Sequence, residues 1–341
     1  MDNDGDLDVA TADEFSNSVS VLVNAGDGTL GTATAIDMGD SAESIVAGDW
    51  DLDGDIDLAA AVFESNEVVI LSPNDVSEFS ELTKLAASDA GLSKNFGFSV
   101  SISGQTAIIG SPHNDDDGEQ SGSAYIVRSL DGTWTEVSKL TASDAEADDK
   151  FGWSAAISGG LAVVGSVLDD DNGSSSGSAY VFQDVDGTWT EVAKLTASDG
   201  AQADGFGIDV AIDGNTVIIG SAYDDDRGNS SGSAYIFQTE NGTWSEVAKL
   251  TGSDGAASDY FGRTVSISGK TTIVGSYGDD DNGNGSATPK AIVKKAKLAD
   301  HDGVVHTSWG DLEYKRGQDA RRLGEFNRQA WHGENHALAY Q

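Results

Sequence analysis

Several residue types are absent or scarce in this sequence. None of the 341 residues is cysteine, so no disulfide stabilises the fold and no thiol chemistry is available. Proline occurs 3 times and glycine 42 times, a balance that suits many short strands joined by tight turns. No apolar run approaches the length of a membrane span. The first six residues lack the basic and apolar regions of a signal peptide.

Basic side chains are also scarce, and they are unevenly placed. The chain has 19 lysine and arginine residues against 58 aspartate and glutamate residues, a formal charge of −39. Residues 285–341 hold nine basic and seven acidic residues, so the deficit lies entirely in residues 1–284. Such a surface repels nucleic acid and anionic membranes and attracts cations. Solubility or adaptation to a salty medium accounts for most of this charge, but not for carboxylates at metal-ligand spacing.

A period of 55 residues organises residues 89–284. The Phe-Gly pair at Phe96 recurs at Phe151, Phe206 and Phe261. A tryptophan, a tyrosine and a Lys-Leu pair keep the same step, at Trp134, Trp189 and Trp244, at Tyr125, Tyr180 and Tyr235, and at Lys139, Lys194 and Lys249. A fixed period of this size is typical of repeat architectures.

The pattern within one repeat is that of short β-strands. Runs rich in Val, Ile, Ala, Tyr and Trp alternate with turn residues, and in one repeat they are Ser154–Ser158, Leu161–Ser166, Ser178–Gln183 and Thr188–Thr196. Four strands make one blade of a β-propeller, and stacked blades cover one another's faces. We therefore predict an all-β propeller of four-stranded blades. The recurring Trp and Tyr side chains are expected to pack between strands rather than to stack on a ligand.

Residues 1–88 carry a related repeat that contains an acidic loop. Carboxylates stand at positions one, three, five and nine of this loop, and glycine stands at position six: Asp49, Asp51, Asp53, Asp57 and Gly54. Alternate side chains of a tight loop point at one centre, and the backbone carbonyl of Asp55 joins them at position seven. A hard cation with several oxygen ligands suits this set, and Ca²⁺ is the natural choice. The alternative is an acidic turn without a metal, in which four carboxylates would repel one another.

An earlier copy of the same motif lies 49 residues upstream, at Asp2, Asp4, Asp6 and Asp8. The residue equivalent to Asp49 would precede Met1. We therefore expect that the chain begins inside a motif and that a signal peptide lies further upstream.

In residues 89–284 the acidic residues have moved to the next loop. Runs of aspartate there predict weak cation loops at Asp115, Asp116, Asp170, Asp171, Asp225, Asp226, Asp280 and Asp281. Adjacent carboxylates cannot all face one ion, so a solvated loop without a cation is the equal alternative.

The repeat ends after Gly283, and residues 285–341 form a basic tail without a period. The tail is expected to be disordered or partly helical, a different module, or a sequence artefact such as a frameshift. His332 and His336 are four residues apart, as metal ligands on one helical face would be, but the glutamate of a zinc protease is not in its place.

The repeats resemble a known family. The segment that opens with Phe96-Gly97 and ends with Gly110-Ser111-Pro112 resembles an FG-GAP repeat, as do its copies at Phe151, Phe206 and Phe261. The Asp49–Asp57 loop is similar to the Ca²⁺ loops of FG-GAP repeats in integrin α-subunits and bacterial surface proteins. The resemblance implies a seven-bladed propeller with Ca²⁺ loops on its lower face and partners often on its upper face. Strand runs for about five blades and part of a sixth are present, so we expect an incomplete or open set.

These features predict a non-catalytic, extracellular or cell-surface, calcium-binding module for adhesion or ligand binding. The partner would be a protein or a carbohydrate, without nucleic acid or membrane insertion. The alternatives are the accessory propeller of a secreted enzyme that acts on polysaccharide and a structural spacer of a large surface protein. No nucleophile elbow or phosphate loop is present. His113 is the lone histidine of the repeats and fits a loop residue better than a general base.

Overall fold

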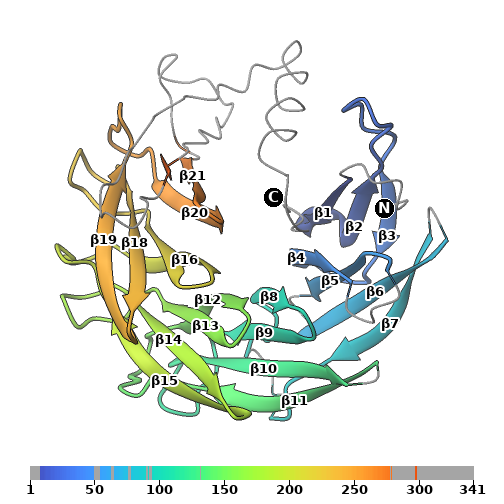
Figure 1. The fold of residues 1–341 in the computed structure, drawn as a ribbon, viewed down its shortest axis with the longest axis horizontal. Helices are drawn as coiled ribbons and strands as arrows, with labels where there is room; N and C mark the ends of the chain where they lie inside the picture. The colour runs from blue at the N-terminus through green and yellow to red at the C-terminus, as the bar shows by residue number, and fades with distance from the viewer. Residues whose placement is uncertain are drawn as a thin grey trace. The chain divides into compact units, whose positions relative to one another are not determined.

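The predicted all-β propeller architecture of four-stranded blades is confirmed. A computed structural model describes residues 8–49, 54–62, 65–75, 78–89, 91, 94–130, 132–276, 278 and 296–297 (Figure 1). Within these residues the regular elements are strands, apart from one short 3-10 turn, Glu14–Ser16. The strands form six sheets, four of them four-stranded and two three-stranded, which agrees with the five to six blades expected.

The described residues form two compact units, the first of which runs to Ser111 and includes Tyr125–Val137. It contains the three-stranded sheet β1-β2-β3, the four-stranded sheet β4-β5-β6-β7, and most of the sheet β8-β9-β10-β11. The strands are β1 (Val9–Asp13), β2 (Ser18–Leu22), β3 (Thr34–Asp37), β4 (Ala42–Gly48), β5 (Asp57–Val62), β6 (Glu67–Asp75), β7 (Glu78–Leu85), β8 (Ser99–Ser103), β9 (Thr106–Ser111), β10 (Ser123–Leu130) and β11 (Thr133–Leu140).

The second unit holds Pro112–Ala124 and the described residues from Ser138 onward. Its complete blades are the sheets β12-β13-β14-β15 and β16-β17-β18-β19, followed by the three-stranded sheet β20-β21-β22. The strands are β12 (Phe151–Ser158), β13 (Leu161–Ser166), β14 (Ser178–Val185), β15 (Thr188–Leu195), β16 (Phe206–Asp213), β17 (Thr216–Ser221), β18 (Ser233–Glu240), β19 (Thr243–Thr251), β20 (Phe261–Ser268), β21 (Thr271–Ser276) and β22 (Ala296–Lys297).

The position of a strand in its blade explains its sequence. The second strand, β13, is buried along most of its length because neighbouring blades cover both faces, and it reads as a continuous apolar run. The outer strand, β15, alternates between exposed and more buried residues, because one of its faces meets solvent. The predicted strand at Ser154–Ser158 proves longer, since β12 begins at Phe151 and a bulge between Phe151 and Ser154 absorbs the irregular register.

Within the second unit, the Phe-Gly pair joins one blade to the blade before it. Phe206 makes a parallel bridge with Gly177 of the preceding blade, and its N–H donates to the Ser176 carbonyl at 2.9 Å. A Cβ atom on Gly177 would lie 2.1 Å from the Phe206 carbonyl oxygen, so only glycine allows this approach. The Phe206 ring then packs edge-on against Tyr235, with 5.4 Å between the ring centroids.

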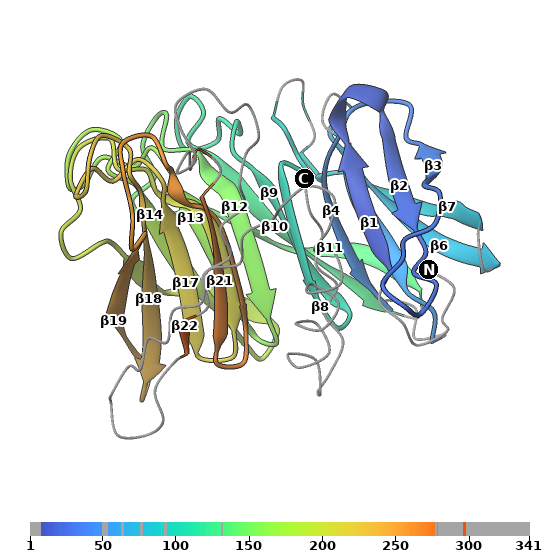
Figure 2. The same cartoon turned by 90° about the horizontal axis from the view of Figure 1, so that it is seen from above.

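A continuous apolar core lies between the two complete blades of the second unit. Val163, Val181 and Leu195 of the first blade join Phe206 and Ile219 of the second in one buried cluster. The views of this unit place the strands of successive blades side by side (Figure 2). Each blade thus buries a face that it could not cover alone. Among the described residues, no helix has the length and apolar character needed to cross a membrane.

Candidate functional sites

The predicted calcium loop connects β4 to β5 in the first unit. Pairing of Gly48 with Asp57 closes the loop at its base, and Gly54 adopts a φ of +97°, as the predicted sharp turn requires. Asp57 is fully buried, with 0% of its surface exposed. The Oδ1 atom of Asp49 is buried and has no hydrogen-bond partner among the described residues. An ionised carboxylate in such a place is costly unless a cation or a donor meets it.

Two central ligands of the predicted set, Asp51 and Asp53, lie outside the described residues. Among the residues that are described, no group of three aspartate, glutamate or histidine side chains converges as a metal site. The calcium loop therefore remains a prediction. In the earlier copy, Asp2, Asp4 and Asp6 also lie outside the description. Asp8 accepts a hydrogen bond from the Asn24 N–H at 2.8 Å, so this carboxylate ties the β1 side of its sheet to the end of β2.

The sequence around the predicted loop carries negative charge almost without positive charge. Residues 1–83 contain twenty aspartate and glutamate residues and no lysine, arginine or histidine. The first basic residue, Lys84, pairs with Glu67 at 3.2 Å and with Glu81 at 3.8 Å. Glu67 lies at the opposite end of the strands from the Asp49–Asp57 loop, and Glu81, on the outer strand β7, pairs with Leu71. The sequence of this region thus offers its loop carboxylates no basic side chain upstream of Lys84.

In the blade β12–β15, the ammonium group of a lysine of the same chain pairs with the carboxylates of the acidic loop. The Nζ atom of Lys194, on the outer strand, lies 2.7 Å from Asp144, 2.9 Å from Asp169 and 2.5 Å from Asp171. Burial opposes the charge of this ammonium, but its hydrogen bonds to the three carboxylates outweigh that effect and raise the pKa of Lys194 above its usual range. We call Lys194, its three carboxylates and Tyr180 the lysine network.

Tyr180 completes the lysine network from the core side. Its hydroxyl oxygen lies 2.8 Å from Asp144 and 2.7 Å from Asp169, and its single hydrogen donates to one of them at a time. The Lys194 ammonium also lies 5.1 Å from the centre of the Tyr180 ring, within cation–π range. Burial and the two carboxylates raise the pKa of the Tyr180 hydroxyl far above its usual range, so it stays protonated and acts as a donor.

The next blade repeats the lysine network with little change. Lys249 contacts one carboxylate of the preceding connection and two of its own loop, at 2.7, 2.9 and 2.6 Å: Asp199, Asp224 and Asp226. Tyr235 stands in the place of Tyr180. In the earlier blade, Lys139 contacts Asp116, but Asn114 occupies the position of the buried Asp169.

In each predicted weak cation loop that the structure describes, one aspartate pairs with the lysine of the same repeat. Asp116, Asp171 and Asp226 each pair with the lysine of their own repeat. Asp115 accepts the Gln120 N–H at 2.8 Å, and Asp170 and Asp225 are exposed. Asp280, Asp281, His332 and His336 lie outside the described residues. His113 is partly buried, and burial together with the charge of Lys150 lowers its pKa.

Sequence reasoning missed the lysine network, although it predicted the role of the aromatic residues. Tyr125, Tyr180 and Tyr235 are fully buried, and Trp189 is nearly so, as expected of packing residues. The buried aspartates, Asp169 and Asp224, were read only as part of an acidic run. One signal was available: lysine, tyrosine and the aspartate that follows Ser143 or Ser198 all share the period of 55 residues.

A recurring aspartate marks the connection between blades in the second unit. Asp149, Asp204 and Asp259 are each 5% exposed. Each accepts, at 2.7 Å, the N–H of the residue three positions earlier. Burial raises the pKa of Asp149 to about 6 and that of Asp204 to about 6. Asp149 and Asp204 therefore keep their protons to a higher pH than an ordinary carboxyl group does.

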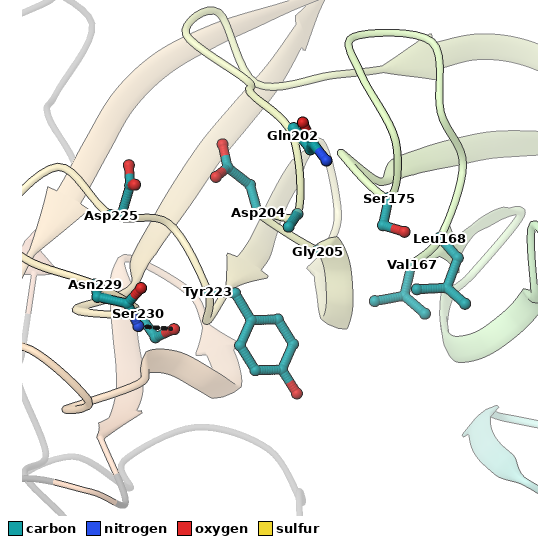
Figure 3. A pocket seen from close by; sticks show the side chains of 11 residues that line it. Val167, Leu168, Ser175, Gln202, Asp204, Gly205, Tyr223, Asp225, Asn229 and Ser230 are labelled. Atoms are coloured by element: carbon teal, nitrogen blue, oxygen red, sulfur yellow. Dashed lines mark hydrogen bonds between the residues drawn. The ribbon is translucent and has the colours of Figure 1, made fainter.

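A groove of about 410 Å³ opens between the loops of the two complete blades. One wall carries Val167 and Leu168, and the other carries Tyr223, whose ring faces them across the groove (Figure 3). Polar side chains complete the lining, among them Ser175, Gln202, Asp204, Asp225, Asn229 and Ser230. A second hollow of about 260 Å³ lies at the turn ends of the same blades, beside Trp244.

Solved structures with the same fold share little sequence with this chain. A protein of unknown function from Desulfotomaculum acetoxidans has a TM-score of 0.60 at 13% identity, covering 91% of this chain and 80% of the other. A candidate 6-phosphogluconolactonase from Bacteroides uniformis has a TM-score of 0.62 at 15% identity, covering 90% and 81%. Another from Bacteroides fragilis has a TM-score of 0.61 at 12% identity, covering 91% and 81%. At these identities the likeness shows the fold alone.

No curated protein matches the chain. Family comparison is decisive, however. The FG-GAP repeat matches residues 79–127, 134–182, 189–237 and 244–288, and an FG-GAP-like repeat matches residues 1–60. Each of the four matches begins on or beside an outer strand and runs through the first strands of the next blade, which is the connection that the Phe-Gly pair makes. These matches cover more than half of the sequence, and the chain belongs to the FG-GAP repeat family.

Proposed function

We propose that this chain is a non-catalytic propeller module that acts outside the cell, is stabilised by Ca²⁺ at the Asp49–Asp57 loop, and binds a protein or carbohydrate ligand. The observation that carries the calcium part is the buried Asp49 Oδ1 atom, which has no hydrogen-bond partner among the described residues. Asp57, at the other end of the same loop, is fully buried. No basic residue precedes Lys84 to compensate for these carboxylates.

The donor set fits a hard cation. Side-chain oxygens of Asp49, Asp51, Asp53 and Asp57 would hold the ion, together with the Asp55 carbonyl, and oxygen-only ligands suit Ca²⁺. The ion would supply the positive charge that the region lacks, and it would perform no chemistry. Loops of this kind bind with dissociation constants of about 10⁻⁴–10⁻³ M in extracellular modules, where Ca²⁺ is abundant enough to fill them. This reasoning supports placing the protein outside the cell.

Thermal unfolding in millimolar Ca²⁺ and in chelator tests the proposal. The ligands converge only in the folded loop, so Ca²⁺ should bind the folded form and stabilise it by about 2.7 kcal/mol when the free ion is a hundredfold above its dissociation constant. Asp49→Ala should abolish the calcium-dependent rise in melting temperature. Asp117→Asn is the control, because it removes one exposed charge from a different loop. Identical melting of the wild type in Ca²⁺ and in chelator would refute the calcium site.

A further inference from the structure

We propose that the groove between the blades β12–β15 and β16–β19 binds one ring of a neutral saccharide. This inference deepens the ligand-binding part of the proposed function by naming a ligand class and its place. It does not depend on the calcium loop, which belongs to other residues. The proposal rests on the shape of the groove at Gly205, on the side chains that line the groove, and on the absence of basic side chains from this lining.

The two walls of the groove come close together at a repeat position that holds glycine. Gly205 is equivalent to Lys150 in the repeat before it and to Tyr260 in the repeat after it. Lys150 is 8% exposed, so its side chain is enclosed at its own junction, and Tyr260 packs against the apolar residues of its junction. A Cβ atom on Gly205 would lie 2.9 Å from Tyr223 Cδ2 and 3.6 Å from Val167 Cγ2. The absence of a side chain at Gly205 therefore lets Tyr223 and Val167 approach this position closely, and Gly205 lines the groove between them.

The Tyr223 ring is held in place on one side and offered to solvent on the other. Its edge contact with Tyr260, at 6.0 Å between ring centroids, restrains the ring from the side of the next blade. Even so, 43% of Tyr223 remains exposed, and so does 37% of Leu168 on the opposite wall. An exposed aromatic ring that faces an aliphatic wall (Figure 3) suits a flat ligand with an apolar face. The C–H face of a pyranose ring has that character, and a fixed tyrosine binds it at little entropic cost.

The polar rim suits hydroxyl groups. Amides at Gln202 and Asn229, hydroxyls at Ser175 and Ser230, and the exposed carboxylate of Asp225 surround the ring-sized gap. These groups include both donors and acceptors, as the hydroxyls of a sugar require. The lining contains no lysine, arginine or histidine, so phosphate, sulfate or carboxylate ligands would find no counter-charge. A neutral polyhydroxylated ligand is the class that satisfies both the apolar walls and the polar rim.

Saturation-transfer NMR of the whole protein with neutral hexasaccharides of glucose, mannose, galactose and N-acetylglucosamine tests this inference. We expect at least one of them to bind with a dissociation constant of about 1 mM, as one shallow sugar subsite gives. Gly205→Lys should weaken that binding at least tenfold, since it places in the groove the residue that the equivalent position already holds at Lys150. Lys150 has a φ of 62° and Gly205 a φ of 62°, so a lysine already adopts this backbone angle at the equivalent position, and the new Cβ would push against the edge of the Tyr223 ring.

Two further variants separate loss of the site from loss of the fold. Tyr223→Ala removes a partly exposed ring and should also weaken binding at least tenfold, while the protein still unfolds cooperatively with only a small fall in melting temperature. His113→Ala, two repeats earlier at the position equivalent to Tyr223, should leave binding unchanged. Binding should persist in chelator, so the groove and the calcium loop can fail separately. The inference is overturned if no hexasaccharide gives saturation transfer, or if Gly205→Lys binds as well as the wild type. It is also overturned if tetramethylammonium binds in the groove and about 1 M NaCl abolishes this binding, because the groove would then be a site for a cation.

Discussion

The blades β4–β7 and β12–β15 both carry an acidic loop, but they place it at different connections and compensate it differently. In β4–β7 the acid lies in the connection of the first two strands, between Gly48 and Asp57. In β12–β15 that connection is a two-residue turn at Gly159 and Gly160, and the acid lies in the next connection, at Asp169–Asp171. The prediction that the acid moves from one loop to the next is thus confirmed for these two blades.

The difference teaches where each loop finds its cation. The outer strand of each blade has a lysine at the same repeat position, Lys84 in one and Lys194 in the other. Lys194 reaches the acidic loop of its blade and contacts three carboxylates, whereas Lys84 pairs with Glu67 and Glu81. A loop at the second connection can therefore be neutralised from within the blade. A loop at the first connection lies away from the lysine of the outer strand. Under the proposed function, the carboxylates of such a loop are neutralised by an ion from solution.

The largest expected effect comes from removing the built-in cation. Lys194→Met leaves Asp144, Asp169 and Asp171 facing one another around an apolar chain, and Asp169 is nearly buried. Urea unfolding at neutral pH should show a loss of about 2–3 kcal/mol, which is less than the loss of about 3–5 kcal/mol for a fully buried pair because two of the carboxylates are partly exposed.

Lys84→Met is the matched control for that change, because it removes the equivalent lysine from exposed partners and should alter stability little. The double variant Asp169→Asn with Lys194→Met copies the asparagine of Asn114 and should recover part of the loss. Equal losses for Lys84→Met and Lys194→Met would mean that the two blades do not differ as described.

A smaller effect is expected from the tyrosine of the lysine network. Tyr180→Phe removes the hydroxyl that faces Asp144 and Asp169, and it should cost about 1.5 kcal/mol, as the loss of a hydrogen bond to a buried charge does. Tyr125→Phe should cost less, since Asn114 stands there in place of the buried aspartate. Unfolding free energies of the two variants, measured side by side, check the order. A greater loss for Tyr125→Phe would contradict the role given to Asp169.

The pH dependence of stability should reveal the buried carboxyl at the blade connection. The pKa of Asp149 is about 6 in the folded protein, above the value of about 3.9 for an unfolded chain. The folded state therefore holds more protons between these values, and this group stabilises the fold increasingly as the pH falls from 7 to 5, by about 1.3 kcal/mol.

Asp149→Asn keeps an oxygen that can accept the Glu146 N–H but cannot titrate. The difference between the two curves of unfolding free energy against pH gives the contribution of Asp149 alone. The charge repulsion within a chain of formal charge −39 affects both proteins and largely cancels. Parallel curves for the two proteins between pH 5 and 7 would show that Asp149 has an ordinary pKa.

The smallest expected effect concerns a clamp between neighbouring outer strands. Glu191 accepts the Ser143 N–H and the Ser143 hydroxyl, both at 2.9 Å, and Glu246 holds Ser198 in the same way. The clamp is exposed, so Glu191→Gln should cost about 0.5 kcal/mol. A double-mutant cycle of Glu191→Gln with Ser143→Ala measures the coupling, which should be positive and of that size. A coupling of zero would show that the clamp contributes nothing to the joining of blades.

The sequence by itself determined the fold class, the period and the packing role of the aromatic residues. Phe151, Phe206 and Tyr180 recur with the period because each blade must bury the same face against its neighbour. Glycine at Gly177 follows from the same repetition, since the close bridge to Phe206 recurs at each junction of the second unit. The turn glycine of the predicted calcium loop, Gly54, could also be predicted, because a sharp loop requires its positive φ.

Only the tertiary structure decided which charges meet. Lys194 lies 50 residues from Asp144 and 25 from Asp169, and no local pattern states that these side chains share one centre. Likewise, Gly205 appears in the sequence as one more loop glycine, and only its position between Tyr223 and Val167 shows that it lines a groove. Local periodicity reports which residues are buried, since burial repeats with the strand. The pairing of side chains from separate strands and loops is set by the packing of blades, which the order of residues does not express.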